Sequence, residues 1–196
     1  MNSFDFEQNS SEWFNHRKKY INASEVSTIM GLNPFESKQS LFRRKLFDEK
    51  IEDNKFMRHG RSLEPKARTF FNDVNKLDFK PLVFVKEFFS ASLDGWNEQT
   101  NSLLEIKCPI NLNSSTWREF FINDVIPIYY YAQVQAQIYC SNADKAFFLV
   151  FQTYQKAKVK EIERDQTFIE KMYKQCLIFY NHFLEGKKIL NKISDN

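Results

Sequence analysis

Residues 81–108 read PLVFVKEFFSASLDGWNEQTNSLLEIKC, and this stretch decides the fold. Its apolar residues form short runs or alternate with polar ones, which is the pattern of β-strands. We predict antiparallel strands over 81–90, 91–96 and 102–108. Asp94 would end the second strand, because Gly95 permits a sharp turn directly after it. A polar connection over 97–101 would lead into the third.

Helical patterns flank the predicted strands on both sides. The N-terminal part, 11–77, repeats apolar residues at helical spacing, with cap candidates at Ser24 and Ser37 and a break near Gly60 before a restart at Pro65. On the C-terminal side we predict a helix over 128–139, strands over 145–151 and 158–162, and a helix over 166–190. The fold class is therefore α/β (α+β), a central mixed sheet flanked by helices, with 1–196 as a single domain divided into 11–77, 81–108 and 128–190.

The composition bounds the class of protein. The 196 residues include 21 Phe, 8 Tyr and 3 Trp, and we place most of these rings in the core. The net charge of +3 does not by itself indicate nucleic-acid binding. No run of about 18 apolar residues and no signal peptide is evident, so we expect a cytoplasmic protein without a membrane segment. Cys108, Cys140 and Cys176 lie in apolar runs, which favours reduced, buried thiols over a disulfide or metal framework.

Acidic side chains meet where the predicted strands pair. On the strand SLLEIKC the period of two places Glu105 and Lys107 on one face and Ile106 on the other. If this strand pairs with its predecessor, Asp94 converges with Glu105. Two carboxylates and a backbone carbonyl suit a hard cation such as Mg²⁺, which acidifies water for attack on a phosphodiester. Because acid-x-Lys triplets recur elsewhere in the chain, an exposed charge pair on a strand explains this triplet equally well.

Short motifs in a fixed order add to this interpretation. They are Arg17 with INASE at 21–25 and Gly31, GRSLEPKA at 60–67, SASLDG at 90–95, LEIKCP at 104–109 and YYAQVQ at 130–135. Over residues 13–172 this set resembles the lambda-exonuclease-like (YqaJ-type) phage recombination nucleases of the PD-(D/E)xK superfamily. The resemblance implies their restriction-endonuclease-like core. Leu93 stands where the superfamily name has proline, and 110–128 matches little.

The resemblance implies a role for each matching residue. Asp94, Glu105 and the backbone carbonyl of Ile106 would ligate the metal, Glu64 would act near it through water, and Lys107 would position the attacking water. Gln133 would sit beside the lysine, with Tyr130 one helical turn earlier. The alternatives are a carboxylate favoured at a helix N-terminus for Glu64, and ordinary helix-surface polarity for Gln133 and Tyr130, since Gln135 and Gln137 show that glutamine is common here.

A second group of residues matches positions that bind the terminal 5′-phosphate of DNA in this family. They are Arg17, Ser24 and Ser92, and a guanidinium with two hydroxyls can surround a phosphate. Each has a simpler explanation, because Ser24 could cap a helix, Arg17 could be solvated, and Ser92 could pair within a strand. Trp13 could wedge against a terminal base pair or pack in the core.

The resemblance implies an enzyme that needs Mg²⁺, with Mn²⁺ as a substitute and one or two ions. It would be a 5′→3′ exonuclease on linear double-stranded DNA that releases 5′-mononucleotides and leaves a 3′ overhang for recombination. The implied partners are DNA ends, further copies in a ring-shaped homotrimer, and a single-strand annealing protein. Three alternatives stay open: a structure-specific or restriction-type endonuclease, a catalytically silent DNA-end-binding mediator, and a structural protein with chance matches.

Overall fold

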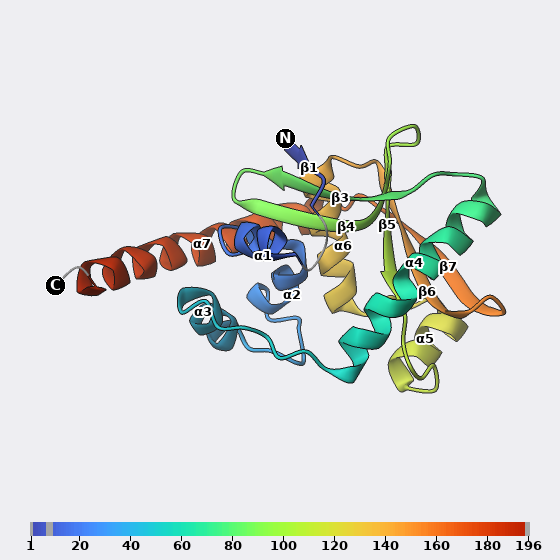
Figure 1. Cartoon of the computed structure of the whole chain (residues 1–196), viewed down its shortest axis with the longest axis horizontal. Helices are drawn as coiled ribbons and strands as arrows, with labels where there is room; N and C mark the ends of the chain where they lie inside the picture. Colours follow the sequence, from blue (N-terminus) through green and yellow to red (C-terminus); the bar gives the residue numbers. More distant parts are fainter. Residues whose placement is uncertain (1, 7–9, 195–196) are drawn as a thin grey trace.

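The computed structural model describes residues 2–6 and 10–194, and within them it forms a seven-stranded mixed sheet (Figure 1). The strand order is β1-β3-β4-β5-β6-β7, and β2 pairs with β4 outside this path. The strands are β1 (Asn2–Phe4), β2 (Ile21–Asn22), β3 (Lys80–Lys86), β4 (Phe89–Asn97), β5 (Ser102–Lys107), β6 (Lys145–Thr153) and β7 (Lys156–Glu163). The β2–β4 and β5–β6 pairs are parallel and the others antiparallel, so the predicted α/β class with a mixed sheet is confirmed.

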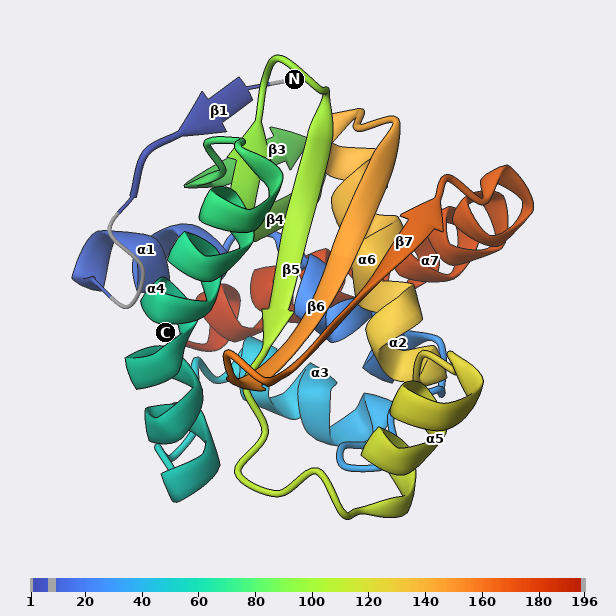
Figure 2. The same cartoon turned by 90° about the vertical axis from the view of Figure 1, so that its right-hand side faces the viewer.

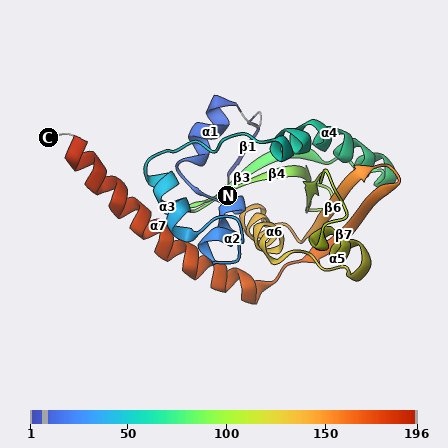
Figure 3. The same cartoon turned by 90° about the horizontal axis from the view of Figure 1, so that it is seen from below.

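Helices cover both faces of the sheet. They are α1 (Ser11–Arg17), the 3-10 turn η1 (Ala23–Glu25), α2 (Val26–Ile29), α3 (Lys38–Leu46), α4 (Lys55–Asn75), α5 (Ser115–Asn123), α6 (Ile128–Ser141) and α7 (Gln166–Ser194). Figures 2 and 3 show α4 on one side of β5 and β6, with α6, α2 and the first part of α7 on the other. The far end of α7 extends beyond the sheet.

Alternation along β5 divides its side chains between the two cores. Leu104 and Ile106 pack under α4 with Ala67 and Phe71, whereas Leu103 belongs to the core beneath α6. Glu105 and Lys107 share the parity of Leu103 and therefore face α6. The period of two thus places the acidic residue and the lysine on the same side, as the sequence predicts.

The predicted turn after Asp94 is wrong, because β4 continues through Gly95 to Asn97. The first hairpin instead turns near Glu87, whose φ is 55°, inside the predicted strand 81–90. Glycine is needed at position 95 for space, since a Cβ there would lie 2.8 Å from the Cβ of Phe79 and 3.1 Å from that of Leu104. Neither neighbouring atom can move without its backbone.

Two helix predictions need correction. The helix over 55–75 does not break near Gly60, and Pro65 lies inside it, because burial of Ala67 and Phe71 holds the segment in one piece. Ser24 does not cap a helix: the Asn22 backbone N–H donates to the Glu25 Oε2 atom at 3.0 Å, and Ser24 lies within η1. Ser37 does cap α3, by accepting from the Ser40 backbone N–H, and this helix ends at Leu46.

The C-terminal predictions agree closely with the structure. The helix predicted over 128–139 is α6, the strands over 145–151 and 158–162 are β6 and β7, and the helix over 166–190 is α7. The stretch 110–128 adds α5, whose first turn is capped by Ser114. The three cysteines are free, with Cys140 and Cys176 buried. In the described part of the chain, no helix is long and apolar enough to cross a membrane.

Candidate active site

Asp94 lies where the hydrogen-bonded ladder between β4 and β5 gives way to side-chain bonds. The register pairs Gly95 with Leu104, so Asp94 stands opposite Glu105, one residue further along the two antiparallel strands. The Ile106 backbone N–H donates to Asp94 Oδ2 at 2.7 Å. From α4, Arg68 Nε donates to the Asp94 carbonyl oxygen. Strand pairing therefore brings the two acidic residues together, even though the predicted turn is absent.

The carboxylate of Glu105 is held from three sides. It is 2% exposed, and its Oε1 atom accepts from Lys107 Nζ at 2.5 Å and from Gln133 Nε2 at 2.7 Å. Its Oε2 atom accepts from Gln137 Nε2 at 2.6 Å. The Lys107 ammonium also lies 4.5 Å from the centre of the Tyr130 ring. The structure thus gathers Glu105, Lys107, Gln133 and Tyr130 as the sequence predicts, and α6 carries both glutamines.

Burial and neighbouring negative charge together set the electrostatics of this site. Burial, and then the charges of Glu105 and Glu64, raise the pKa of Asp94 well above its ordinary value. Burial also raises the pKa of Glu64, although Arg68, which bonds it at 2.5 Å, opposes the shift. For Lys107, burial lowers the pKa, but attraction to Glu105 and its other neighbours outweighs burial, so the pKa is raised. The lysine therefore stays protonated, and the acids favour an added cation.

A second corner of the site, the arginine corner, joins the residues predicted to bind a phosphate, which are Arg17, Ser24 and Ser92. Arg17 Nη2 donates to Ser24 Oγ at 3.0 Å, and the guanidinium lies 4.4 Å from the centre of the Trp13 ring. Trp13 Nε1 in turn donates to Ser92 Oγ at 2.9 Å. Trp13 therefore neither hangs free nor packs in the core, since it connects Arg17 with Ser92.

A buried ion pair supports this corner from below. The Lys45 ammonium lies 2.9 Å from Glu25 Oε2, and their side chains are 4% and 8% exposed. Lys45 also donates to the Tyr20 carbonyl oxygen at 2.8 Å. Burial alone would raise the pKa of Glu25, but attraction to Lys45 and Arg17 outweighs burial, so its pKa is lowered. The pair ties α3 to η1, which carries Ser24.

One cavity of about 340 Å³ unites both groups. Its walls include every predicted side chain except Tyr130, which stands behind Lys107: Arg17, Ser24, Glu64, Ser92, Asp94, Glu105, Lys107 and Gln133. Ile106, Trp13 and Ala23 also line it, as do Met57 and Arg61 of α4. The acids and the arginine corner thus face the same space, which links a candidate cation site to a candidate anion site.

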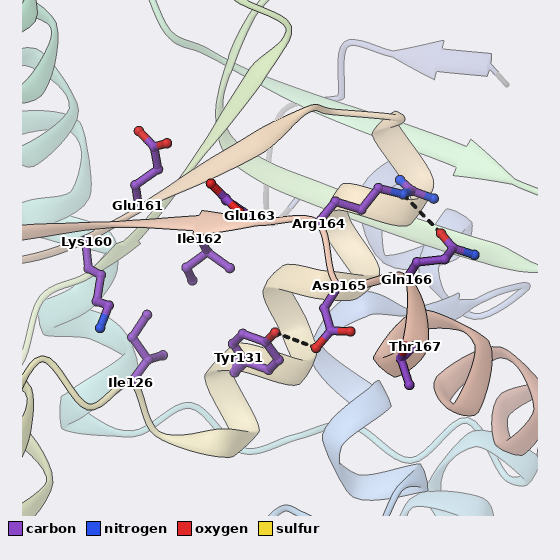
Figure 4. Close-up of a pocket in the computed structure, with 10 residues that line it drawn as sticks. All are labelled: Ile126, Tyr131, Lys160, Glu161, Ile162, Glu163, Arg164, Asp165, Gln166 and Thr167. Carbon is purple, nitrogen blue, oxygen red and sulfur yellow. Dashed lines mark hydrogen bonds between the residues drawn. The ribbon is translucent and has the colours of Figure 1, made fainter.

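A larger hollow of about 630 Å³ lies between the first turns of α6 and α7 (Figure 4). Several of its polar groups are already paired: the Tyr131 hydroxyl donates to Asp165 Oδ2 at 2.9 Å, and Arg164 Nε donates to Gln166 Oε1 at 3.3 Å. Burial and the bond to Asp165 raise the pKa of Tyr131 to about 12. Gln135 connects α6 to the segment before α7, because its Nε2 donates to the Glu163 carbonyl oxygen and its Oε1 accepts from the Asp165 backbone N–H. We interpret this hollow as a structural junction.

Two functional neighbours escaped the sequence analysis. Gln137 is fully buried and donates a hydrogen bond to Glu105. It is therefore not an ordinary polar residue of a helix surface, which is what the frequency of glutamine in this helix suggests. It stands four residues after Gln133, on the same helical face, and this spacing was the available signal. Arg68 likewise stands four residues after Glu64 and bonds both that carboxylate and the Asp94 backbone.

The donor atoms present fit a hard divalent cation. Among residues 2–6 and 10–194, no three His, Cys, Asp or Glu side chains form a cluster that could hold a metal by themselves. Three carboxylates, those of Glu64, Asp94 and Glu105, face the cavity together with Ile106, and Arg68 already pairs with Glu64. The ligand set would therefore need a backbone carbonyl and water to complete it, which is common for Mg²⁺. Burial, and then the charges of Glu105 and Glu64, raise the pKa of Asp94, and a cation beside these carboxylates would oppose that shift.

The sequence of this chain matches a family of viral recombinases. The family model of the YqaJ-like viral recombinase domain matches residues 12–144, and the chain belongs to this family. It is 27% identical over 189 residues to YqaJ of Bacillus subtilis, covering 92% of this chain and 58% of that protein. An uncharacterized protein of Acanthamoeba polyphaga mimivirus is 26% identical over 182 residues, or 84% of this chain and 32% of that protein. The chain thus spans about a third and somewhat over half of these two relatives.

Solved structures share the fold. The alkaline exonuclease LHK-Exo of Laribacter hongkongensis superposes with a TM-score of 0.81 at 24% identity, covering 95% of this chain and 98% of that one. The same enzyme in complex with dAMP gives a TM-score of 0.81 at 23% identity, with the same coverage. A phage-related exonuclease of Haemophilus somnus gives 0.71 at 15% identity, covering 92% and 99%. These structural neighbours are exonucleases, and at these identities they establish the fold alone.

Proposed function

We propose that this protein is a Mg²⁺-dependent 5′→3′ exonuclease that degrades one strand of linear double-stranded DNA. It releases 5′-mononucleotides and leaves a 3′ single-stranded overhang for recombination by strand annealing. One observation carries the proposal: a single cavity holds Asp94, Glu105 and Lys107 opposite Arg17 and its serine partners. Membership of the recombinase family and the exonuclease fold support it.

The cation belongs with the acids. Asp94, Glu105 and the Ile106 carbonyl would hold Mg²⁺ or Mn²⁺, with Glu64 acting through water or at a second ion. When bound, the ion supplies stabilisation of the negative charge that develops on the phosphate. Arg68 bonds Glu64 and the Asp94 backbone at once, so it fixes α4 against β4 at this point.

Lys107 orients the attacking water. Its raised pKa keeps it protonated, so it donates a hydrogen bond rather than taking a proton. Gln133 Oε1 lies 3.5 Å from Lys107 Nζ, and Tyr130 presents its ring to the same ammonium. These contacts restrict where the ammonium points. Gln137 fixes the other oxygen of Glu105, so the carboxylate cannot rotate freely.

The arginine corner explains the polarity that we propose. A terminal 5′-phosphate is a dianion, and a guanidinium flanked by the Ser24 and Ser92 hydroxyls supplies charge-assisted donors for it. The Trp13 ring contacts the Arg17 guanidinium and its Nε1 donates to Ser92 Oγ, so Trp13 holds the two sides of the corner together. An end anchored here would place a neighbouring phosphodiester at the acids, so hydrolysis would begin at the 5′ end.

The proposed partners follow from this chemistry. DNA ends are the substrate, and the dAMP complex of the related exonuclease supports a nucleotide in this type of fold. A ring-shaped homotrimer around the duplex would keep the enzyme on its substrate, and its channel would need basic residues only locally, in keeping with a net charge of +3. A single-strand annealing protein would receive the overhang.

The test is digestion of linear duplex DNA, with and without a 5′-phosphate, beside covalently closed circular DNA, in Mg²⁺ and in EDTA. We expect loss of the linear duplex from its 5′ ends, no attack on the circle and no reaction in EDTA. Asp94→Ala or Lys107→Ala should abolish digestion and keep the circular dichroism spectrum. Cleavage of the circle would instead identify an endonuclease, and binding of ends without digestion would identify a silent mediator.

A further inference from the structure

A row of aromatic rings leads from the site lysine to the protein surface. Tyr130 lies over Lys107 and stacks on Trp117, with ring centres 5.8 Å apart and planes 17° apart. The ring centres of Tyr129 and Tyr130 lie 4.5 Å apart. Phe35 and Tyr129 pack edge-to-face, with ring centres 5.6 Å apart and ring planes at 82°. Figure 1 shows the α2–α3 connection, which carries Phe35, beside the first turn of α6. The surface end of the row is the pair Phe35 and Tyr129.

Phe35 is unusually exposed for a large apolar side chain. Its exposed fraction is 80%, the highest value for any large hydrophobic residue in the described part of the chain. Burial of a phenylalanine ring in a protein core is favourable because it removes apolar surface from water, and Phe35 forgoes most of that gain. Tyr129 beneath it is half-buried, so the pair offers ring surface without a covering side chain.

The backbone that presents Phe35 is firmly anchored. The Phe35 N–H donates to Asn33 Oδ1 at 2.9 Å, and Asn33 Nδ2 donates to the buried Thr28 hydroxyl at 2.8 Å. The Asn33 N–H also donates to the Ser27 carbonyl oxygen at 3.2 Å. Pro34, between Asn33 and Phe35, has its own φ angle fixed by the proline ring. An exposed ring on a fixed loop loses little entropy when a flat ligand stacks on it.

We propose that Phe35 and Tyr129 form a stacking platform for an unpaired nucleobase of DNA. This inference rests on the proposed function, because continuity with Lys107 through Tyr130 is what places a strand next to the platform. Nucleobases are flat and have two π faces, so they stack on exposed aromatic rings whatever their sequence. The platform would hold a base that has left the duplex while the adjoining strand occupies the cavity.

The test measures binding without hydrolysis. A short single-stranded oligonucleotide carrying 2-aminopurine is titrated with the full chain in EDTA, and stacking is read from fluorescence quenching. Phe35→Ala should weaken binding by about 5- to 150-fold, which is the worth of one stacked base (~1–3 kcal/mol at ~1.4 kcal/mol per tenfold). Phe35→Trp should bind as tightly as wild type or more tightly. Phe35→Leu, which keeps the apolar bulk without a ring, should behave like Phe35→Ala.

Phe47 is the matched control, since it is another exposed phenylalanine, 57% exposed, one residue beyond α3. Phe47→Ala should leave affinity and quenching unchanged. Equal affinity of wild type and Phe35→Ala would overturn the proposal, as would equal losses at both phenylalanines. A change of sedimentation coefficient in Phe35→Ala, without a change in binding, would assign the surface to a second copy of the chain and equally overturn it.

Failure of the platform and failure of the nuclease are separable. Asp94→Asn should lose digestion of linear duplex and keep the 2-aminopurine quenching, because Phe35 and Tyr129 are untouched. A wild-type chain that quenches 2-aminopurine but digests no DNA in Mg²⁺ would defeat the exonuclease and leave the platform standing. A chain that digests DNA, but whose 2-aminopurine binding does not depend on Phe35, would defeat the platform and leave the exonuclease standing.

Discussion

Replacing Gly95 by alanine tests whether close packing, rather than a turn, requires glycine beside Asp94. The added methyl would lie 2.8 Å from the Cβ of Phe79 and 3.1 Å from that of Leu104, both closer than ordinary contact. Overpacking of this kind costs about 1–3 kcal/mol. The smaller entropy of the unfolded alanine chain returns about 0.4–1 kcal/mol. The expected net loss is therefore centred on about 1.3 kcal/mol of unfolding free energy, or about 3–5 °C in Tm for a chain of this size.

Gly60 supplies the control within the same chain. It lies inside α4, and a Cβ there would meet no atom within 4 Å. Alanine is about 0.8–1 kcal/mol more favourable than glycine in a helix interior, so Gly60→Ala should stabilise the fold by about that amount. Urea unfolding followed by circular dichroism would measure both variants, with metal removed by EDTA so that ligand binding does not contribute.

The two substitutions should move the unfolding midpoint in opposite directions. Gly95→Ala should also slow DNA digestion, because the backbone that must yield is directly attached to Asp94. If both variants shift the midpoint upward by similar amounts, the contacts with Phe79 and Leu104 do not limit this position, and the packing argument is refuted. A destabilised Gly95→Ala variant with full nuclease activity would refute the coupling to Asp94 while leaving the packing argument intact.

Three further changes probe the site. Because folding raises the pKa of Asp94, the stabilising contribution of this group is present in acid and is lost as pH rises through the folded pKa. Asp94→Asn should therefore raise Tm in EDTA at alkaline pH, and the difference in Tm from wild type should narrow toward acid. A Tm difference that does not change with pH would contradict this. Gln137→Leu should lower the unfolding free energy by about 1.5–3 kcal/mol and raise the Mg²⁺ concentration needed for half-maximal digestion, because the buried Glu105 carboxylate loses a hydrogen-bond donor. Wild-type values for both quantities would exclude Gln137 as a positioning residue. Arg17→Ala should reduce the preference for 5′-phosphorylated over 5′-hydroxyl ends by about 10- to 150-fold in initial rate, and a preserved preference would place the phosphate elsewhere.

The sequence was sufficient where a short period dominates. Alternation along 102–107 placed Glu105 and Lys107 on one face, and the helix over 128–139 was evident from its apolar spacing. These patterns report burial on one side of an element, which is a local property. The shared cavity came from the ordered motifs and their resemblance to a family, since no local pattern brings Arg17 near Asp94.

The errors arose where distant contacts decide the structure. Asp94-Gly95 has the composition of a turn, but Phe79 and Leu104 need the space that glycine leaves, and neither is close to it in sequence. The role of Gln137 depends on the placement of α6 across β5. Helix α5 was missed although Trp117, Phe120 and Phe121 recur at helical spacing and contact the core, because it is only nine residues long and lies in a segment that no motif marks.

The ion pair between Lys45 and Glu25 has a consequence for experiments in solution. Mobile ions screen charges that face water, but they hardly reach a pair whose side chains are 4% and 8% exposed. Contacts between DNA phosphates and the arginine corner, in contrast, should weaken steeply as salt is added. A salt titration should therefore remove the ligand without deforming its receptor, and activity lost in high salt should return in full on dilution.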